Sequence, residues 1–207
     1  MDAKMKMLLR VRPVGPWQTN AYVLTCPASG QSVLIDPGGE PRRLEAMLEG
    51  TRPAAVLITH SHPDHIGALD EMRARLRVPV MAHPAFAGTA VDRALADGVS
   101  VAVGEHRLLV HHAPGHTRDQ LCLAVEGDVR AIVGDAIFEG GPGKTWTPDD
   151  FQTTLTTLRR VVLAWPDDTT CYPGHGTPFR LGDIRAAIQS FLSRNHGRFC
   201  GDATWGM

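Results

Sequence analysis

The chain has 207 residues, 43% of them hydrophobic and 21% charged, which is typical of a globular protein rather than a disordered one. The 21 Lys and Arg balance 22 Asp and Glu, and this net charge of −1 argues against a protein that binds nucleic acid through a strongly basic surface. No apolar run approaches the ~18 residues of a membrane span, and residues 1–12 lack the apolar core of a signal peptide.

Short apolar segments separated by Pro and Gly predict a group of antiparallel strands at the start of the chain: Met7–Val11, Ala21–Thr25 and Val33–Ile35. The helical spacing of Leu44, Met47 and Leu48 predicts a first helix over Pro41–Glu49. The continuous apolar run Ala54–Ile58 is typical of a strand that is buried on both faces. A histidine-rich loop follows it directly.

The rest of the chain alternates between predicted helices and strands. Apolar residues from Ile66 to Leu76 recur at helical spacing, and Val78–Ala82 fits a strand. Further strands are predicted at Leu108–His112, Leu121–Val125, Arg130–Val133 and near Cys171 and Tyr172. Thr147 fits the N-cap of a helix that begins with Pro148. Its buried side would carry Phe151, Leu155, Leu158 and Val162, and a last helix is expected near Asp183–Leu192. This order predicts one α/β domain of layered sheets and helices.

Four cysteines, Cys26, Cys122, Cys171 and Cys200, show neither C-x-x-C spacing nor clustering. This pattern is typical of isolated thiols in a reducing compartment, although two disulfides are an alternative. We therefore expect a cytoplasmic protein without nucleic-acid or membrane partners. The sequence predicts no oligomeric state.

The strongest motif is the loop after the buried strand, Thr59-His60-Ser61-His62-Pro63-Asp64-His65. In an extended segment, positions two apart project to the same side, so His60 and His62 can converge on one ion. Asp64 and His65 lie where the loop turns into a helix and can point toward a neighbouring site. Imidazole and carboxylate ligands together favour zinc, iron or manganese over calcium or magnesium. The alternative is a solvated polar loop.

Three later residues stand on glycine-bearing loops or strand ends: His116, Asp135 and His175. Taken alone, each is explained better by a structural role, such as a hydrogen-bonded histidine or an Asp turn. Together with the first motif they are candidate ligands, because loops at strand ends often carry functional residues.

With these residues in this order, the chain resembles the metallo-β-lactamase superfamily and, within it, the glyoxalase II-like hydrolases. The resemblance covers nearly the whole chain, from Leu34-Ile35-Asp36-Pro37-Gly38 through the His-x-His-x-Asp-His loop to His175. It implies a four-layer αβ/βα sandwich with the metal site at one edge of the sheets. Residues 1–207 would form a single domain of this type.

The resemblance also implies two divalent metal ions per chain, with zinc favoured and iron or manganese as alternatives. Its ligand pattern assigns His60, His62 and His116 to the first ion, Asp64, His65 and His175 to the second, and Asp135 to both. Asp64 and Asp135 would be the catalytic carboxylates, beside a metal-bridging hydroxide that attacks an acyl carbon. Asp36 would either support a ligand imidazole or cap the turn that follows it.

The implied activity is hydrolysis of a small-molecule thiolester such as acylated glutathione. Lys144 stands nine residues after Asp135, where the family has a lysine that binds a glutathione carboxylate, and Trp146 stands at an aromatic position. Without the resemblance, Lys144 would be a solvated surface charge. Thr177 replaces a family tyrosine, and only 32 residues follow His175. The C-terminal helical substrate-binding segment of glyoxalase II would then be largely missing, and we expect a more open pocket.

The alternative activity is that of a persulfide dioxygenase, an iron-dependent oxidoreductase on the same fold. Those enzymes have Arg-Thr-Asp near the position of Lys144-Thr145-Trp146, and Ala-His where this chain has Gly174-His175. Both differences favour a hydrolase. Zinc β-lactamases usually have Cys or Ser where Asp135 stands, and a non-catalytic binding protein should have lost ligands.

The remaining histidines are less informative. His112 fits either the pocket or a sheet position. His83, His106, His111 and His196 are expected at the surface or in structural roles.

Overall fold

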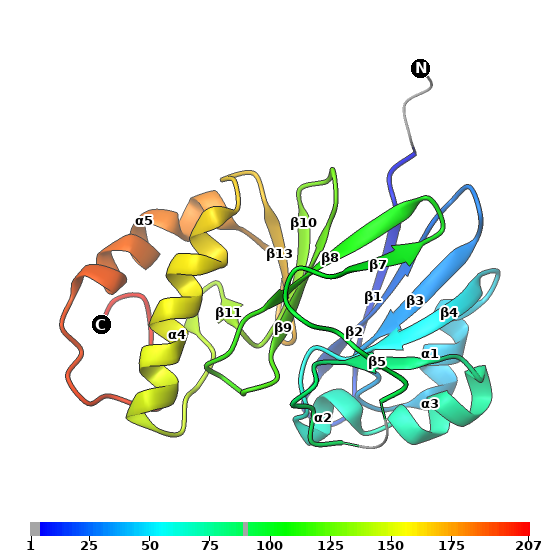
Figure 1. The fold of residues 1–207 in the computed structure, drawn as a ribbon, viewed down its shortest axis with the longest axis horizontal. Helices are drawn as coiled ribbons and strands as arrows, with labels where there is room; N and C mark the ends of the chain where they lie inside the picture. The colour runs from blue at the N-terminus through cyan, green and yellow to red at the C-terminus, as the bar shows by residue number, and fades with distance from the viewer. Residues whose placement is uncertain (1–4, 89–90) are drawn as a thin grey trace.

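The computed structural model describes residues 5–88 and 91–207, and its centre consists of two six-stranded sheets that face each other (Figure 1). The first sheet runs β1 (Leu8–Val14), β2 (Thr19–Thr25), β3 (Gln31–Ile35), β4 (Arg52–Leu57), β5 (Val80–Ala82) and β6 (Arg93–Ala94). The second runs β14 (Phe179–Arg180), β13 (Thr170–Pro173), β10 (Arg130–Gly134), β9 (Leu121–Val125), β8 (His106–His112) and β7 (Ser100–Val103). The hairpin strands β11 (Ile137–Phe138) and β12 (Gly141–Pro142) pair beside them.

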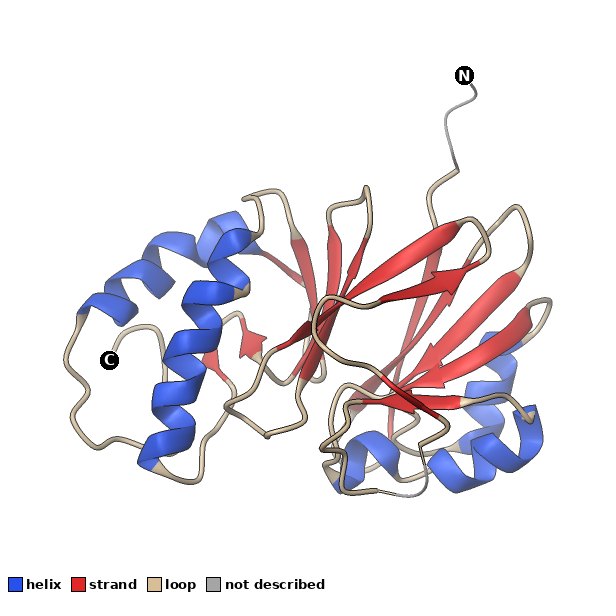
Figure 2. Ribbon diagram, viewed as in Figure 1, coloured by secondary structure: helices blue, strands red, loops and turns tan. Residues whose placement is uncertain are grey.

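Helices cover the outer face of each sheet (Figure 2). The first sheet carries α1 (Pro41–Leu48), α2 (Pro63–Ile66) and α3 (Leu69–Leu76). The second carries α4 (Pro148–Arg160), a short 3₁₀ helix (Val162–Ala164) and α5 (Leu181–Ser193). The layers are therefore helix, sheet, sheet and helix, and the predicted four-layer αβ/βα sandwich is confirmed.

Three apolar cores hold these layers together, because side chains alternate between the two faces of each strand. In β2, Tyr22 and Leu24 point into the core between the sheets, whereas Ala21 and Val23 point toward α1 and α3. The same alternation places Val33 and Ile35 between the sheets. Both faces of these strands are buried, which is why each has a run of successive apolar residues, Ala21–Leu24 and Val33–Ile35.

Several local predictions are confirmed. The first three strands pair antiparallel, and Thr147 caps α4 by accepting a hydrogen bond from the Asp150 N–H at 3.1 Å. Pro148 is the first residue of that helix. The four residues predicted for its buried side are all buried, although the last of them lies just beyond the end of the helix: Phe151, Leu155, Leu158 and Val162.

One expected helix is divided in two, and five short strands were not predicted. The helix predicted from Ile66 to Leu76 is divided into α2 and α3 around Gly67, whose neighbour Ala68 donates its N–H to the Pro37 carbonyl at 2.8 Å. A Cβ at Gly67 would collide with the Gly38 carbonyl oxygen, so the chain docks against this turn instead of continuing the helix. The short strands β6, β7, β11, β12 and β14 were not predicted, since two to four residues carry too little periodicity.

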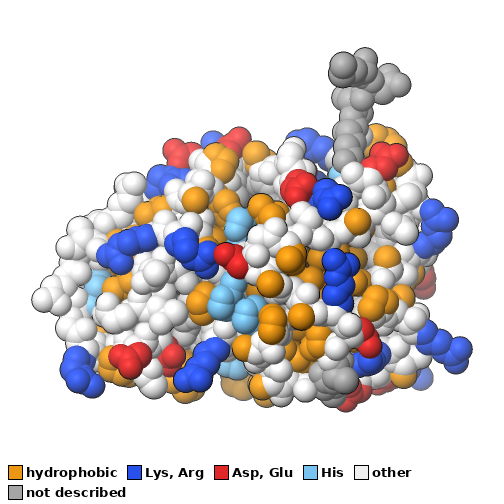
Figure 3. Space-filling view, viewed as in Figure 1, with side chains coloured by type: hydrophobic (Ala, Val, Ile, Leu, Met, Phe, Trp, Pro, Cys, Tyr) orange, Lys and Arg blue, Asp and Glu red, His pale blue; other side chains and the backbone are white. Residues whose placement is uncertain are grey.

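The described residues contain no helix that is both long and apolar enough to span a membrane. On the face shown in Figure 3, basic side chains are interspersed with acidic ones, and histidine side chains reach the surface near the middle.

Candidate metal centre

All seven predicted ligands come together where strands of both sheets end. His60, His62, Asp64 and His65 follow β4, in the loop and first turn that lead into α2. From the second sheet, His116 lies between β8 and β9, Asp135 follows β10, and His175 follows β13. Parallel strands end at the same edge of a sheet, which is why β10 and β13 bring Asp135 and His175 to one place.

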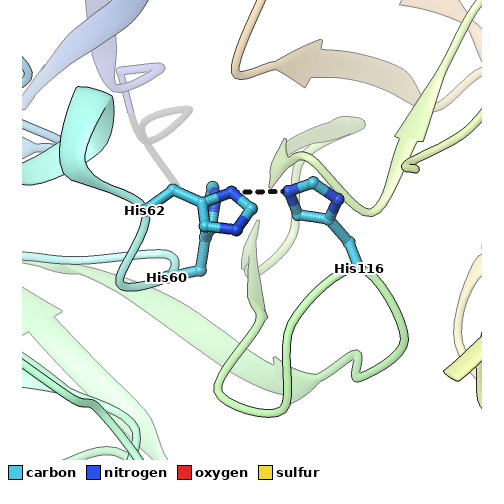
Figure 4. A group of neighbouring side chains, drawn as sticks. All are labelled: His60, His62 and His116. Atoms are coloured by element: carbon cyan, nitrogen blue, oxygen red, sulfur yellow. Dashed lines mark hydrogen bonds between the residues drawn. The ribbon is translucent and has the colours of Figure 1, made fainter. Parts of the chain in front are cut away.

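The first group of ligands consists of His60, His62 and His116, whose nearest ring nitrogens all lie within 4.8 Å of one another. Figure 4 shows the three rings turned toward each other, with His60 and His62 on one loop and His116 on another. His62 Nδ1 and His116 Nε2 are 2.9 Å apart. Three imidazoles that converge in this way could hold one metal ion.

The second group consists of Asp64, His65 and His175, again with one atom from each within 4.8 Å of the others. Asp64 Oδ2 lies 3.2 Å from His175 Nε2 and 3.7 Å from His65 Nε2. Both groups are built from imidazole and carboxylate, which suits zinc, iron or manganese.

Asp135 lies between the two groups. Its Oδ1 is 3.4 Å from His65 Nε2, and its Oδ2 is 3.5 Å from His116 Nε2 and 3.6 Å from His175 Nε2. Its carboxylate thus faces ligand atoms of both groups, as a bridging ligand must.

Hydrogen bonds behind the rings aim the Nε2 atoms of three histidines at the centre. His65 Nδ1 contacts Asp36 Oδ2 at 2.9 Å, His116 Nδ1 contacts the Lys144 carbonyl at 2.8 Å, and His175 Nδ1 contacts the Trp17 carbonyl at 3.1 Å. A carbonyl oxygen only accepts, so Nδ1 of His116 and His175 donates, and in the neutral form of each ring the lone pair is on Nε2. Such partners are the usual way in which proteins orient metal-binding histidines.

Asp36 contacts both the ligand His65 and the residue that precedes the ligand loop, Thr59. It is buried, and it accepts hydrogen bonds from the Thr59 N–H at 2.8 Å and the Thr59 hydroxyl at 2.7 Å as well as contacting His65. The Thr59 hydroxyl in turn lies 3.1 Å from His60 Nδ1. The side chain of Asp36 therefore supports the ligand loop, while the following turn is closed by a backbone bond from the Gly38 N–H to the Asp36 carbonyl.

The residues fit a bound metal. His60 Nε2, His65 Nε2 and Asp135 Oδ1 are buried and have no hydrogen-bond partner among the described residues. Buried polar atoms are rarely left in this state, and each of these three faces the centre. Gly174 leaves room there, because a Cβ at this position would collide with Asp135 Oδ1 and the His65 ring.

Burial and charge shift the pKa values of the ligand histidines in opposite directions. Burial lowers the pKa of His60 well below its ordinary value, and the neighbouring imidazoles lower it further. Burial also lowers the pKa of His65, but the carboxylates of Asp36 and Asp135 outweigh it and raise the pKa to about 10. Burial raises the pKa of Asp135, yet contacts with His65 and His116 bring it below its ordinary value. His65 would thus release a proton when a metal ion binds to Nε2.

The two predicted substrate residues lie at the edge of the centre. The Trp146 ring is 5.6 Å from the rings of both His62 and His116 and is 56% exposed. Lys144 Nζ lies 5.6 Å from the Trp146 ring and 3.3 Å from Asp202 Oδ2. Lys144 therefore has a carboxylate partner within the chain, which the sequence did not predict.

A second exposed tryptophan, Trp17, lies on the turn between β1 and β2, beside the second group. It is 74% exposed and lines a cavity of about 180 Å³ together with Asp64 and Thr19. Phe138 lies 6.4 Å from the His175 ring. The centre is thus flanked by apolar rings on both sides.

Three of the four cysteines are buried, and Cys200 is exposed. All four cysteines are free, so the disulfide alternative is wrong. The rings of His83 and His112 stack at 4.0 Å, and His106 is buried.

The sequence did not predict a supporting role for four residues that hold the ligands or their loops: Thr19, Asn20, Tyr22 and Thr59. The only local signal was a pair of polar residues, Thr19 and Asn20, at the start of an otherwise apolar strand.

Residues 14–175 match the family model described as the metallo-beta-lactamase superfamily. The probable metallo-hydrolase YqgX of Bacillus subtilis (strain 168) is 33% identical over 193 residues, covering 82% of this chain and 90% of that protein. The hydroxyacylglutathione hydrolase of Chromohalobacter salexigens is 32% identical over 183 residues, covering 87% of this chain and 70% of that enzyme.

Among solved structures, ETHE1 from Myxococcus xanthus superposes with a TM-score of 0.81 at 27% identity, covering 91% of this chain and 86% of that one. TTHA1623 in a di-iron-bound form gives a TM-score of 0.73 at 30% identity, covering 85% of this chain and 96% of that one.

Proposed function

Because the chain belongs to the metallo-beta-lactamase superfamily, we propose that it is a dinuclear metal-dependent hydrolase that cleaves a thiolester such as acylated glutathione. The observation that carries this proposal is the position of Asp135 between two groups of ligands. Several hydroxyacylglutathione hydrolases about 30% identical to the chain support the substrate class. We propose zinc as the metal, with iron or manganese as alternatives.

The ligand assignment follows the two groups. His60, His62 and His116 would hold one ion, Asp64, His65 and His175 the other, and Asp135 both. Divalent ions bound there would lower the pKa of a water molecule toward about 7 and would polarise the thiolester carbonyl.

The chain's own residues have three tasks in this reaction. Asp135 presents one oxygen to each group and so sets the distance between them. Asp64, with 22% of its side chain exposed, would position the attacking water through the second ion, which its Oδ2 would help to hold beside His175. Asp36 keeps the Nδ1 proton of His65 engaged, so that Nε2 stays available toward the centre.

For the substrate, we propose that the Trp146 ring packs against the thiol portion and that Lys144 pairs with a carboxylate. The ion pair between Lys144 and Asp202 is exposed, with 50% and 79% of the two side chains accessible. An exposed pair is weak, so a substrate carboxylate can replace Asp202 at little cost.

A second candidate function is an iron-dependent oxidoreductase of the persulfide dioxygenase type. The neighbour solved in a di-iron-bound form supports iron as the metal bound at such a site. The residues Lys144-Thr145-Trp146 and the glycine before His175 favour the hydrolase.

One sample of purified protein can test both candidates. Metal content is measured by elemental analysis, and the same protein is assayed for hydrolysis of acylated glutathione and for oxygen uptake with glutathione persulfide. Two metal ions per chain with thiolester hydrolysis are expected. One iron per chain with persulfide-dependent oxygen consumption would contradict the proposal.

We further propose that residues 1–207 act as one domain, since both sheets contribute ligands to one centre. Free cysteines support a reducing compartment such as the cytoplasm.

A further inference from the structure

Residues 17–22, at the turn before β2 and the start of that strand, contact the second group of ligands repeatedly; we call them the β2 entry segment. The Thr19 hydroxyl donates to Asp64 Oδ2 at 2.8 Å. The Trp17 carbonyl accepts a hydrogen bond from His175 Nδ1 at 3.1 Å. One short segment therefore contacts two of the three ligands in this group directly.

The same segment also holds the backbone around His175. The Asn20 side chain donates to the carbonyls of Pro173 at 3.0 Å and Gly176 at 2.8 Å, and its backbone N–H donates to the Gly174 carbonyl at 2.7 Å. The Tyr22 hydroxyl donates to the Pro173 carbonyl at 2.6 Å. These bonds join positions more than 150 residues apart and connect β2 of one sheet to the end of β13 in the other (Figure 1).

The contacts are made by buried side chains. Thr19 and Tyr22 are 0% exposed and Asn20 is 3% exposed. A buried donor that loses its partner costs far more than an exposed one, because water cannot replace the bond. The entry segment therefore restrains the loop that carries His175 much more strongly than exposed contacts would.

The first group takes its support from other parts of the chain. His60 Nδ1 lies 3.1 Å from the Thr59 hydroxyl, and His116 Nδ1 donates to the Lys144 carbonyl at 2.8 Å. The loop before His116 is held by Thr157 of α4, whose hydroxyl donates to the Pro114 carbonyl at 2.6 Å. No hydrogen bond between described residues links the entry segment to His60, His62 or His116.

We propose that the β2 entry segment is a positioning element for the second metal ion alone. Thr19 fixes the carboxylate of Asp64, while Trp17, Asn20 and Tyr22 fix His175 beside it. The inference rests on the ligand assignment of the proposed function, but not on the identity of the substrate. If the proposal holds, metal binding to the second group depends on contacts between the two sheets. Metal binding to the first group does not depend on these contacts.

The test measures zinc binding to metal-free protein by titration calorimetry, with elemental analysis after desalting. His116→Ala and His175→Ala serve as references that identify the binding event of each group. Thr19→Val and Tyr22→Phe keep the shape of the side chain and remove one hydroxyl each. Thr157→Val removes a hydroxyl of similar burial beside the first group and is the matched control.

Thr19→Val and Tyr22→Phe should each weaken the second binding event by about 10- to 100-fold and leave the first unchanged. Thr157→Val should leave the second event unchanged. In the His175→Ala background, Thr19→Val should cause no further loss of zinc, because the group it supports is already disrupted. Thermal unfolding of each metal-free variant checks that the fold is retained.

Equal weakening of both events by Thr19→Val and Tyr22→Phe would overturn the inference, since it would indicate a general structural role. Unchanged affinities in both variants, or a wild-type protein that binds only one zinc ion, would overturn it as well. A wild-type protein that binds two zinc ions without hydrolysing thiolesters would contradict the proposed substrate and leave this inference standing.

Discussion

Asp135 is the single residue on which the proposed dinuclear centre depends most. Replacing it by Ala removes the carboxylate that faces His65, His116 and His175, and with it a negative charge that offsets the repulsion between two dications. We expect Asp135→Ala to reduce both metal content and kcat, the latter by more than the ~10–100-fold typical of losing a supporting partner. Elemental analysis measures the metal content, and steady-state kinetics measure kcat. A variant with two metal ions and near-normal turnover would contradict the bridging assignment.

Lys144 and Asp202 make a second prediction at the residue scale. If Lys144 binds a substrate carboxylate, Lys144→Ala should raise KM for acylated glutathione by about 2- to 5-fold and leave kcat nearly unchanged, because the contact is remote from the reacting carbonyl. Asp202→Asn should lower the same KM, because it removes the carboxylate that competes for Lys144. High salt should reduce both effects.

An acyl thiol without carboxylates is the control for this pair. Both variants should hydrolyse it as the wild type does. Equal effects on charged and uncharged thiolesters would show that Lys144 does not recognise substrate charge, and the glutathione proposal would lose its support from this residue.

At the scale of elements, Asp97 connects the loop before β7 to β8 and α4. It accepts from the His112 N–H at 2.7 Å and from Arg160 Nη1 at 2.9 Å. Partial burial raises the pKa of Asp97, but the His112 N–H and the Arg160 guanidinium lower it by more, so that it lies below its ordinary value. The resulting stability is present above the unfolded-state pKa of about 3.9 and is lost as the pH falls through the folded-state pKa.

We therefore expect Asp97→Asn to destabilise the protein by less than about 1 kcal/mol at pH 7, because 48% of the Asp97 side chain is exposed and solvent screens the pair. The difference from the wild type should shrink as the pH falls below about 4. Urea unfolding of both proteins at pH 7, 4 and 3 measures it. A difference that grows toward low pH would contradict a lowered pKa of Asp97 in the folded state.

At the scale of the whole molecule, the candidate centre lies where the two sheets meet, so metal binding and folding are coupled. Ions that bind the folded chain stabilise it, by about 4 kcal/mol when free metal exceeds Kd 1,000-fold. Removing metal with EDTA should lower the midpoint of thermal unfolding, and added zinc should restore it. Added magnesium should not restore the midpoint, because magnesium binds poorly to imidazole ligands. An unchanged midpoint after verified metal removal would contradict this coupling.

Features that depend on near neighbours along the chain could be predicted from the sequence. His60, His62, Asp64 and His65 lie within six positions, and their order after a buried strand was enough to predict convergence on metal ions. The cap at Thr147 and the apolar segments of β2 and β3 are local in the same sense, because they depend on residues a few positions apart. The resemblance of the motifs then predicted the layer order that the structure confirms.

Contacts between distant residues, in contrast, required the tertiary structure. The division of the helix at Gly67 depends on a turn some thirty residues earlier, and the partner of Lys144 is Asp202, far along the chain. Asn20 contacts the loop of His175 only because β2 begins, and β13 ends, at the same edge of facing sheets. Local propensities carry no information on such contacts, since strand order, packing of the sheets and burial set the distances between segments that the sequence keeps far apart.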